Sequence, residues 1–170
     1  GRYEYFYGEI YDGEWKEDKQ QGNGKLMYPD GSVYEGDYKD GKKDGKGTFR
    51  TPDGNVYKGD YENDMRNGLG TYTMVGGDVY EGEWKNDSQN GRGKLTSVDG
   101  SGYEGKWKDG LYHGRGKLVS ADGSIYIGDF LNNQKNGHGR YTDYKGFVYE
   151  GEFLNGKYNG HGILKYENGP

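Results

Sequence analysis

A period of 23 residues runs through the chain and limits what it can fold into. A tyrosine followed two residues later by glycine recurs at this interval without insertion or deletion; the tyrosines are Tyr11, Tyr34, Tyr57, Tyr80, Tyr103, Tyr126 and Tyr149. Four glycines per unit keep the same phase and account for 28 of the 35 glycines. A mean hydropathy of -1.25 would allow a disordered chain. Low-complexity sequence does not hold such a phase, so the period excludes that class.

Each unit alternates with period two, which is the period of a β-strand. In residues 34–38, Tyr34, Gly36 and Tyr38 point to one face, and Glu35 and Asp37 point to the other. A second segment, residues 91–95, alternates in the same way. Dense glycine and the lack of a 3.6-residue period argue against helix. We therefore predict an all-β fold, an elongated single-layer antiparallel sheet of tandem 23-residue β-hairpin repeats.

The pattern also predicts how each hairpin is built. About six polar residues separate the two strand segments, as in residues 85–90, so we expect a hairpin loop slightly longer than the commonest ones. A second turn, such as residues 99–101, leads into the next repeat. The strand glycines should make room for aromatic rings, with Trp84 or Tyr61 lying across a glycine of its hairpin partner.

A register follows if each repeat tyrosine faces the residue fifteen positions later. All of those residues are apolar or aromatic: Leu26, Phe49, Tyr72, Leu95, Leu118, Tyr141 and Leu164. The same register opposes acidic and basic side chains in the pairs Asp12–Lys25, Asp37–Lys46, Glu81–Lys94, Glu83–Arg92, Glu104–Lys117, Asp129–His138 and Glu152–His161. Each such pair stabilises a sheet by roughly 0.2 to 1 kcal/mol. One predicted pair, Lys106–Arg115, is like-charged and counts against this register.

A unit that reads YEGEW, then GxGxL, then DGS resembles the MORN repeat (membrane occupation and recognition nexus). The resemblance covers nearly the whole chain as one array: a half repeat at 1–10, followed by repeats at 11–33, 34–56, 57–79, 80–102, 103–125, 126–148 and 149–170. It implies a rod with an aromatic-lined groove, placed near the cytoskeleton or a membrane. Residues 74–77 and 142–146 depart from the usual turn, and each departure predicts a bend or a contact point.

Composition excludes several classes of function. A net charge of -5 with mixed signs argues against a nucleic-acid partner. The chain has no cysteine, which fits an intracellular, cytoplasmic protein and rules out disulfides and thiolate zinc sites. No phosphate loop, dinucleotide fingerprint or nucleophile elbow is present, so we expect no enzyme activity and no cofactor. The chain begins at Gly1 without methionine, so we interpret it as part of a longer protein.

The aromatic stripe is the best candidate site. A single-layer sheet has no second layer to cover it, and contiguous exposed aromatic surface usually marks an interaction site. The predicted groove residues are Tyr34, Tyr38, Tyr57, Tyr61, Tyr80, Trp84, Tyr103, Trp107, Tyr126 and Phe130. A helix or extended peptide of a protein partner would lie along them. The alternative is that these rings only pack against each other.

Other partners follow from other features. Unpaired strand edges at the array ends predict a homodimer. Direct phosphoinositide or other phospholipid binding is the alternative function, although no polybasic cluster supports it. His138 and His161 occupy equivalent places in adjacent repeats near Asp129 and Glu152, which gives a weak metal site as the alternative to ordinary surface histidines. We expect no metal, and the sequence predicts a non-catalytic scaffold that binds protein partners or another copy of itself.

Overall fold

The computed structural model describes residues 1–166, and every regular element in that range is a β-strand. It forms two compact units, residues 1–88 (unit 1) and 89–170 (unit 2). Unit 1 contains β1 (Arg2–Glu4), β2 (Ile10–Lys16), β3 (Lys19–Met27), β4 (Val33–Lys39), β5 (Lys42–Arg50), β6 (Val56–Glu62), β7 (Met65–Thr73) and β8 (Val79–Lys85). Unit 2 contains β9 (Ser88–Thr96), which begins at the boundary, β10 (Gly102–Lys108), β11 (Leu111–Val119), β12 (Ile125–Leu131), β13 (Gln134–Thr142), β14 (Phe147–Leu154) and β15 (Lys157–Tyr166).

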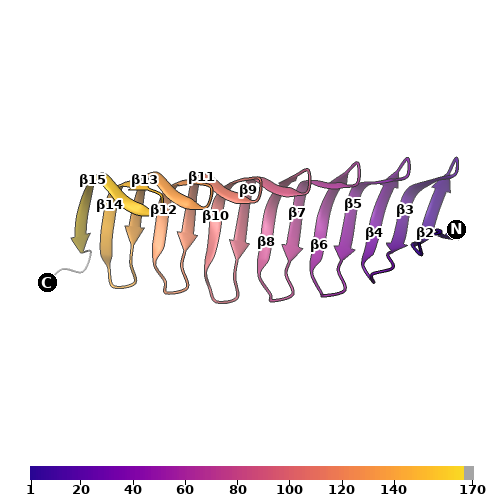
Figure 1. Ribbon diagram of the computed structural model, residues 1–170, viewed down its shortest axis with the longest axis horizontal. Coiled ribbons are helices and arrows are strands. Elements are labelled where there is room, and N and C mark those ends of the chain that lie inside the picture. The colour runs from indigo at the N-terminus through magenta and orange to yellow at the C-terminus, as the bar shows by residue number, and fades with distance from the viewer. Residues whose placement is uncertain (167–170) are drawn as a thin grey trace. The chain divides into compact units, whose positions relative to one another are not determined.

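Within each unit, every strand pairs antiparallel with its neighbours in the chain (Figure 1). This confirms the all-β architecture of tandem hairpins. Within residues 1–166, no helix has the length and apolar character needed to cross a bilayer.

The hairpin turns are shorter than predicted. β4 ends at Lys39 and β5 begins at Lys42, so only Asp40 and Gly41 lie between them. Their φ values are 51° and 83°, and positive φ at both central residues is the signature of a type I′ turn. The predicted six-residue loop is therefore wrong. The polar residues at both ends of the predicted loop belong to the strands. A one-layer sheet exposes strand residues as fully as loop residues, so polarity alone does not distinguish the two.

The turns between hairpins match the prediction. In the turn after β3, the amide of Tyr28 donates to the carbonyl of Ser32 at 2.9 Å, and Gly31 supplies a φ of 90°. The turn after β7 contains residues 74–77, whose sequence departs from the usual one. There the amide of Met74 donates to the carbonyl of Asp78 at 2.8 Å, and Gly77 supplies a φ of 96°. The backbone of this turn is thus unchanged by the departure in sequence.

The predicted register holds for the first half of each hairpin. Tyr11 faces Leu26, Tyr34 faces Phe49, and Tyr57 faces Tyr72. Unit 2 repeats this with Tyr103 and Leu118, Tyr126 and Tyr141, and Tyr149 and Leu164. The charged pairs Asp12–Lys25 and Glu104–Lys117 are also confirmed.

Beyond the paired central glycines, a β-bulge breaks this register. Gly36 faces Gly47, but Tyr38 faces Lys43, so residues 44–46 oppose Asp37 alone. Lys46 instead faces Asp60 of the next hairpin and forms an ion pair with it. The same shift makes the predicted pairs Asp37–Lys46, Asp129–His138, Glu152–His161 and Lys106–Arg115 wrong; His138 faces Glu152, and Lys106 faces Arg92. The bulge escaped the sequence analysis because the third strand glycine, with φ of 111° at Gly45, was interpreted as space for a ring.

The other two strand glycines do make room for a ring. A Cβ on Gly70 would lie 2.5 Å from Cε2 of Tyr57, so only glycine fits beneath that ring. Trp84 and Tyr61 do lie across a glycine, but the prediction that this glycine belongs to their own hairpin is wrong. Trp84 faces Gly68 and Tyr61 faces Gly45, both on the preceding hairpin.

Candidate functional site

The seven repeat tyrosines, which we call the core row, form the buried centre of each unit. Their exposed fractions are between 0% and 5%. Each hydroxyl of the row for which a bond is described donates to a carbonyl three residues later, as from Tyr34 to Asp37 and from Tyr57 to Asp60, both at 3.0 Å. Burial raises the pKa of Tyr103 and of Tyr126 to about 12, so these phenols stay protonated at any physiological pH.

A second set of rings joins neighbouring core tyrosines within each unit. Tyr61 meets Tyr57 edge-to-face at 5.3 Å between centroids and meets Tyr34 at 5.1 Å. Phe130 joins Tyr126 and Tyr103 in the same way, at 5.1 and 5.0 Å. Edge-to-face pairs contribute about 0.5–1.5 kcal/mol each beyond the area they bury. Aromatic pairing along the array therefore replaces the aliphatic core that the chain lacks.

Within each unit, the structure brings the predicted groove residues together as packed core. All ten are buried, and the most exposed of them is Tyr61 at 7%. Their role in binding remains a prediction. A partner on this face would first contact the side chains that lie over these rings.

Those covering side chains come from the position nine residues after the core tyrosine, and we call the residues at this position the cap row. The row comprises Gln20, Lys43 and Arg66 in unit 1 and Gln89, Tyr112, Lys135 and Tyr158 in unit 2. Lys43 places its Nζ 5.0 Å from the centroid of Tyr34, and Arg66 places its Cζ 5.5 Å from Tyr57 and 4.4 Å from Trp84. Tyr112 stacks on Tyr103 at 3.9 Å with an interplanar angle of 11°. The cap row is thus the thin cover that a single-layer sheet was expected to lack.

The cap row was not predicted, although the residue types at one position of the 23-residue repeat could have indicated it. Position nine after the core tyrosine is held by glutamine, lysine, arginine or tyrosine, all long side chains that can lie flat over a ring. Only the bulge brings this position opposite the second ring of the repeat, as Lys43 opposite Tyr38. The bulge had not been predicted, so neither had the cap.

Beside the cap row lies a groove of about 360 Å³ on the aromatic face of unit 1. Its walls are the half-buried rings of Phe49 and Tyr72, and its floor is Tyr57 and Tyr61. Lys43, Thr51, Asn55, Asp64, Arg66 and Asp87 complete the rim. Flat aromatic walls with polar groups on the rim can hold an extended chain and orient its backbone.

The groove is electrostatically mixed. Burial lowers the pKa of Lys43, and the carboxylates of Asp64 and Asp87 oppose that shift. The Arg66 side chain donates to the carboxylate of Asp87 at 3.2 Å and to its backbone carbonyl at 2.7 Å. These contacts hold the cations against the rings, so the groove offers an ordered surface and not a cluster of mobile charges.

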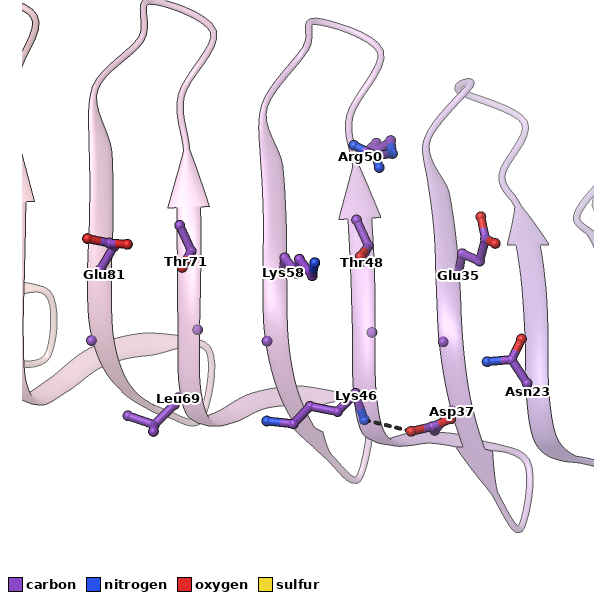
Figure 2. A pocket seen from close by; sticks show the side chains of 15 residues that line it. Asn23, Glu35, Asp37, Lys46, Thr48, Arg50, Lys58, Leu69, Thr71 and Glu81 are labelled. Carbon is purple, nitrogen blue, oxygen red and sulfur yellow. Dashed lines mark hydrogen bonds between the residues drawn. The ribbon is translucent and has the colours of Figure 1, made fainter.

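The opposite face of unit 1 is polar. Figure 2 shows Glu35, Thr48, Lys58, Thr71 and Glu81 side by side at one level of five successive strands, as their pairing requires. At the bulge, a carboxylate of Asp37 accepts from the backbone amide of Lys46 at 2.9 Å (Figure 2). Unit 1 as a whole has 12 basic and 19 acidic residues, a net charge of -7.

The polar face of unit 2 differs in charge and in hydrophobicity. Unit 2 has 11 basic and 9 acidic residues, a net charge of +2. Its paired rows hold the cations Arg92, Lys94, Lys106, Arg115, Lys117 and Arg140 and the carboxylates Glu104, Asp129, Glu150 and Glu152. Ile127 and Ile163 interrupt this face with exposed fractions of 43% and 67%. Both line an open trough of about 650 Å³ that also contains His138 and His161.

The alternative of a histidine metal site gains no support from the arrangement of these side chains. His138 faces Glu152 across the strands. Within residues 1–166, no three side chains of the histidine, cysteine, aspartate or glutamate type gather closely enough to hold an ion.

Repeated hairpins, a one-layer sheet and an aromatic centre define a tandem-repeat protein of the open β-sheet class. A family model, the MORN repeat, matches residues 11–33, 34–56, 57–79, 80–102, 103–125, 126–148 and 149–170. The chain therefore belongs to the MORN repeat family. No curated protein matches its sequence significantly.

Solved structures with a similar sheet include the following two. One is the TCP domain of SAS-4 (dCPAP) of Drosophila melanogaster in complex with a proline-rich motif of Ana2, with 16% identity, 88% of this chain and 81% of that chain covered, and a TM-score of 0.50. Another is the G-box domain of the microcephaly protein CPAP, with 13% identity, 98% and 86% coverage, and a TM-score of 0.56. At such low identity the likeness is one of fold.

Proposed function

We propose that this chain is a non-catalytic scaffold that holds an extended segment of a protein partner in the aromatic groove of unit 1. The observation that carries the proposal is the pair of half-buried rings, Phe49 and Tyr72, that wall an open groove between ordered cations and carboxylates. The buried rings predicted as the binding site support these walls from below.

A proline-rich segment suits this groove. Such segments adopt the polyproline II conformation before binding, so they lose little entropy when they dock on aromatic walls. The SAS-4 domain with a similar sheet binds a proline-rich motif, which supports the same class of ligand here. A role in centriole elongation is suggested for the CPAP domain of similar fold, which supports a cytoskeletal setting.

The test is titration of a dye-labelled proline-rich peptide, followed by fluorescence anisotropy, with a scrambled Gly/Ser peptide of equal length as the probe control. Phe49→Leu and Tyr72→Leu install the residue that Leu26, Leu95 and Leu118 carry at the equivalent position, so they preserve the fold. We expect each substitution to weaken peptide binding by about tenfold, since one ring contributes about 1–3 kcal/mol to such a site.

Tyr141→Leu is the matched control, because it makes the same change at the same repeat position in unit 2. We expect it to leave the affinity unchanged. Equal binding of the proline-rich and Gly/Ser peptides, or equal binding by wild type and Tyr72→Leu, would contradict the proposed site.

Self-association through the array ends and direct phospholipid binding remain predictions. The apolar side chains of Ile163, Leu164 and Tyr166 on β15 are all more than 60% exposed, which favours self-association. Sedimentation equilibrium over a range of protein concentrations measures it. Co-sedimentation with phosphoinositide vesicles measures lipid binding.

A further inference from the structure

We infer that the polar face of unit 2, which the proposed function does not use, is a second docking surface for an acidic peptide segment with alternating apolar residues. The surface is the cross-strand row Lys117, Ile127, Arg140, Glu150 and Ile163, which crosses β11 to β15. Each member lies directly opposite the next in the strand pairing.

The two isoleucines are out of place on a polar face. At the position of Ile127, the other six repeats carry Asp12, Glu35, Lys58, Glu81, Glu104 and Glu150. At the position of Ile163, they carry Lys25, Thr48, Thr71, Lys94, Lys117 and Arg140. Both isoleucines line the same open trough, together with Arg115, Arg140 and Glu150. Exposed apolar side chains beside two arginines and one carboxylate fit a ligand that is apolar and carries acidic groups to pair with the arginines.

The spacing defines the ligand pattern. Adjacent strands lie about 4.8 Å apart, so Ile127 on β12 and Ile163 on β15 are roughly 14 Å apart. An extended peptide crossing the strands advances about 3.3 Å per residue, so its residues i and i+4 meet the two isoleucines. Residue i+2 then lies between Arg140 and Glu150, nearer to Arg140, and residue i−2 lies near Lys117. The fitting segment is therefore acidic, any, apolar, any, acidic, any, apolar.

Charge favours a protein segment over a bilayer. The unit carries a net charge of +2, but Glu150 lies between the two isoleucines in the same row, and Asp129 and Glu152 lie in the next row. A flat anionic leaflet that covered both isoleucines would also cover these carboxylates, at a cost in desolvation and repulsion. A peptide can place its acidic groups nearer to the cations than to the carboxylates. The Nη1 of Arg140 donates to the hydroxyl of Thr142 at 3.1 Å, which orders its guanidinium on this face.

The experiment measures fluorescence anisotropy of the dye-labelled peptide Asp-Ser-Leu-Ser-Glu-Ser-Leu and of a control peptide with lysine in place of both acids. Two variants, Ile127→Glu and Ile163→Thr, remove the apolar contacts. Each introduces a residue that other repeats carry at the same position. Lys58→Glu makes the equivalent position of unit 1 resemble Glu35 and Glu81, and it serves as the control variant. Thermal unfolding of each variant confirms that the fold is intact.

We expect wild type to bind the acidic peptide at least about tenfold more tightly than the lysine peptide, and more weakly as salt rises. Each isoleucine substitution should weaken binding by about tenfold, and Lys58→Glu should leave it unchanged. Equal affinity for both peptides, or an affinity that neither isoleucine substitution alters, overturns the proposal. Co-sedimentation of wild type, but not of Ile127→Glu, with mixed phosphatidylcholine and phosphatidylserine vesicles also overturns it, in favour of a membrane surface. Because the proline-rich probe is directed at the aromatic groove of unit 1, its result is independent of this one.

Discussion

The ring of Tyr57 lies so close over Gly70 that a single added methyl group would overlap it. A Cβ built on Gly70 would lie 2.5 Å from Cε2 of Tyr57, well inside van der Waals contact. The same relationship joins Tyr103 to Gly116 at 2.5 Å in unit 2. Core tyrosine and strand glycine therefore pack as a pair in each repeat whose two strands lie in one unit.

Gly70→Ala should destabilise the protein by about 1–3 kcal/mol, because the ring or the strand must move to accept the methyl group. Urea unfolding followed by circular dichroism measures the change. Gly76→Ala is the matched control, since nothing lies within 4 Å of the Cβ position there, and it should be neutral or slightly stabilising. Equal effects of the two substitutions would contradict this account of the glycines.

Removing a tyrosine hydroxyl should have opposite effects at two positions of the core. Tyr57→Phe deletes a 3.0 Å hydrogen bond to the carbonyl of Asp60 and should cost about 1 kcal/mol. The hydroxyl of Tyr38 is buried, and residues 1–166 offer it no hydrogen-bond partner, so Tyr38→Phe should be neutral or stabilising. Paired urea titrations test this, and a loss of stability in Tyr38→Phe as large as in Tyr57→Phe would refute it.

Alkaline pH should unfold the chain through its core tyrosines. Burial raises the pKa of Tyr103 and of Tyr126 to about 12, whereas an unfolded tyrosine titrates near 10. Above pH 10 the unfolded state therefore loses protons that the folded state keeps, and the free energy of unfolding falls as pH rises. Each such tyrosine contributes a slope of about 1.4 kcal/mol per pH unit between its two pKa values. Absorbance at the tyrosinate band should rise together with loss of the circular dichroism signal, and ionisation of the core row within an intact sheet would contradict the prediction.

The carboxylate of Asp60 should stabilise the bulge. Its Oδ2 accepts from the backbone amide of Leu69 at 2.8 Å, and it also pairs with Lys46. Burial acts to raise the pKa of Asp60, but these hydrogen bonds outweigh it and lower the pKa. The contribution is therefore present above the unfolded pKa of about 3.9 and is lost as pH falls below it.

Asp60→Ala leaves the Leu69 amide without its acceptor and should cost about 1–2 kcal/mol at neutral pH. The difference from wild type should shrink at pH values below the unfolded pKa, where wild type loses the same interaction. Lys58→Ala, on the same strand but with its side chain away from the bulge, should change stability by less than about 0.5 kcal/mol. A difference between wild type and Asp60→Ala that stays constant with pH would exclude a role for the charge.

The 23-residue period predicted the fold because the same residue pattern, repeated in phase, must form the same hairpin in every repeat. Alternation around Tyr34 and Gly36 specified which face was buried, and the pairing of Tyr34 with Phe49 followed from it. The bulge did not follow, because Gly45 looks the same in sequence whether it makes space for a ring or adopts a positive φ. Without the bulge, the sequence could not predict the register of the second half of each hairpin, the two-residue turns or the cap row.

The sequence predicts that the aromatic residues share one face of each unit, and they do. The sequence does not predict how far these rings are covered, and their role in binding stays a prediction. Burial depends on the side chain nine positions later, such as Lys43 over Tyr34. That contact joins two strands through a bulge, and a strand pattern alone does not reveal it. The polar face of unit 2 was overlooked because Ile127 and Ile163 lie in different repeats, and only the strand pairing places them in one row.

The cap row is distinct from the residues that determine the fold, and a partner that binds the aromatic face contacts the cap row first. Glycines, core tyrosines and two-residue turns fix the backbone, while the cap position accepts lysine, arginine or tyrosine over the core tyrosine of its repeat. An array of this kind can therefore acquire new binding preferences by point substitutions 23 residues apart, without repacking its interior. A gene that duplicates one hairpin also gains one more independently adjustable contact.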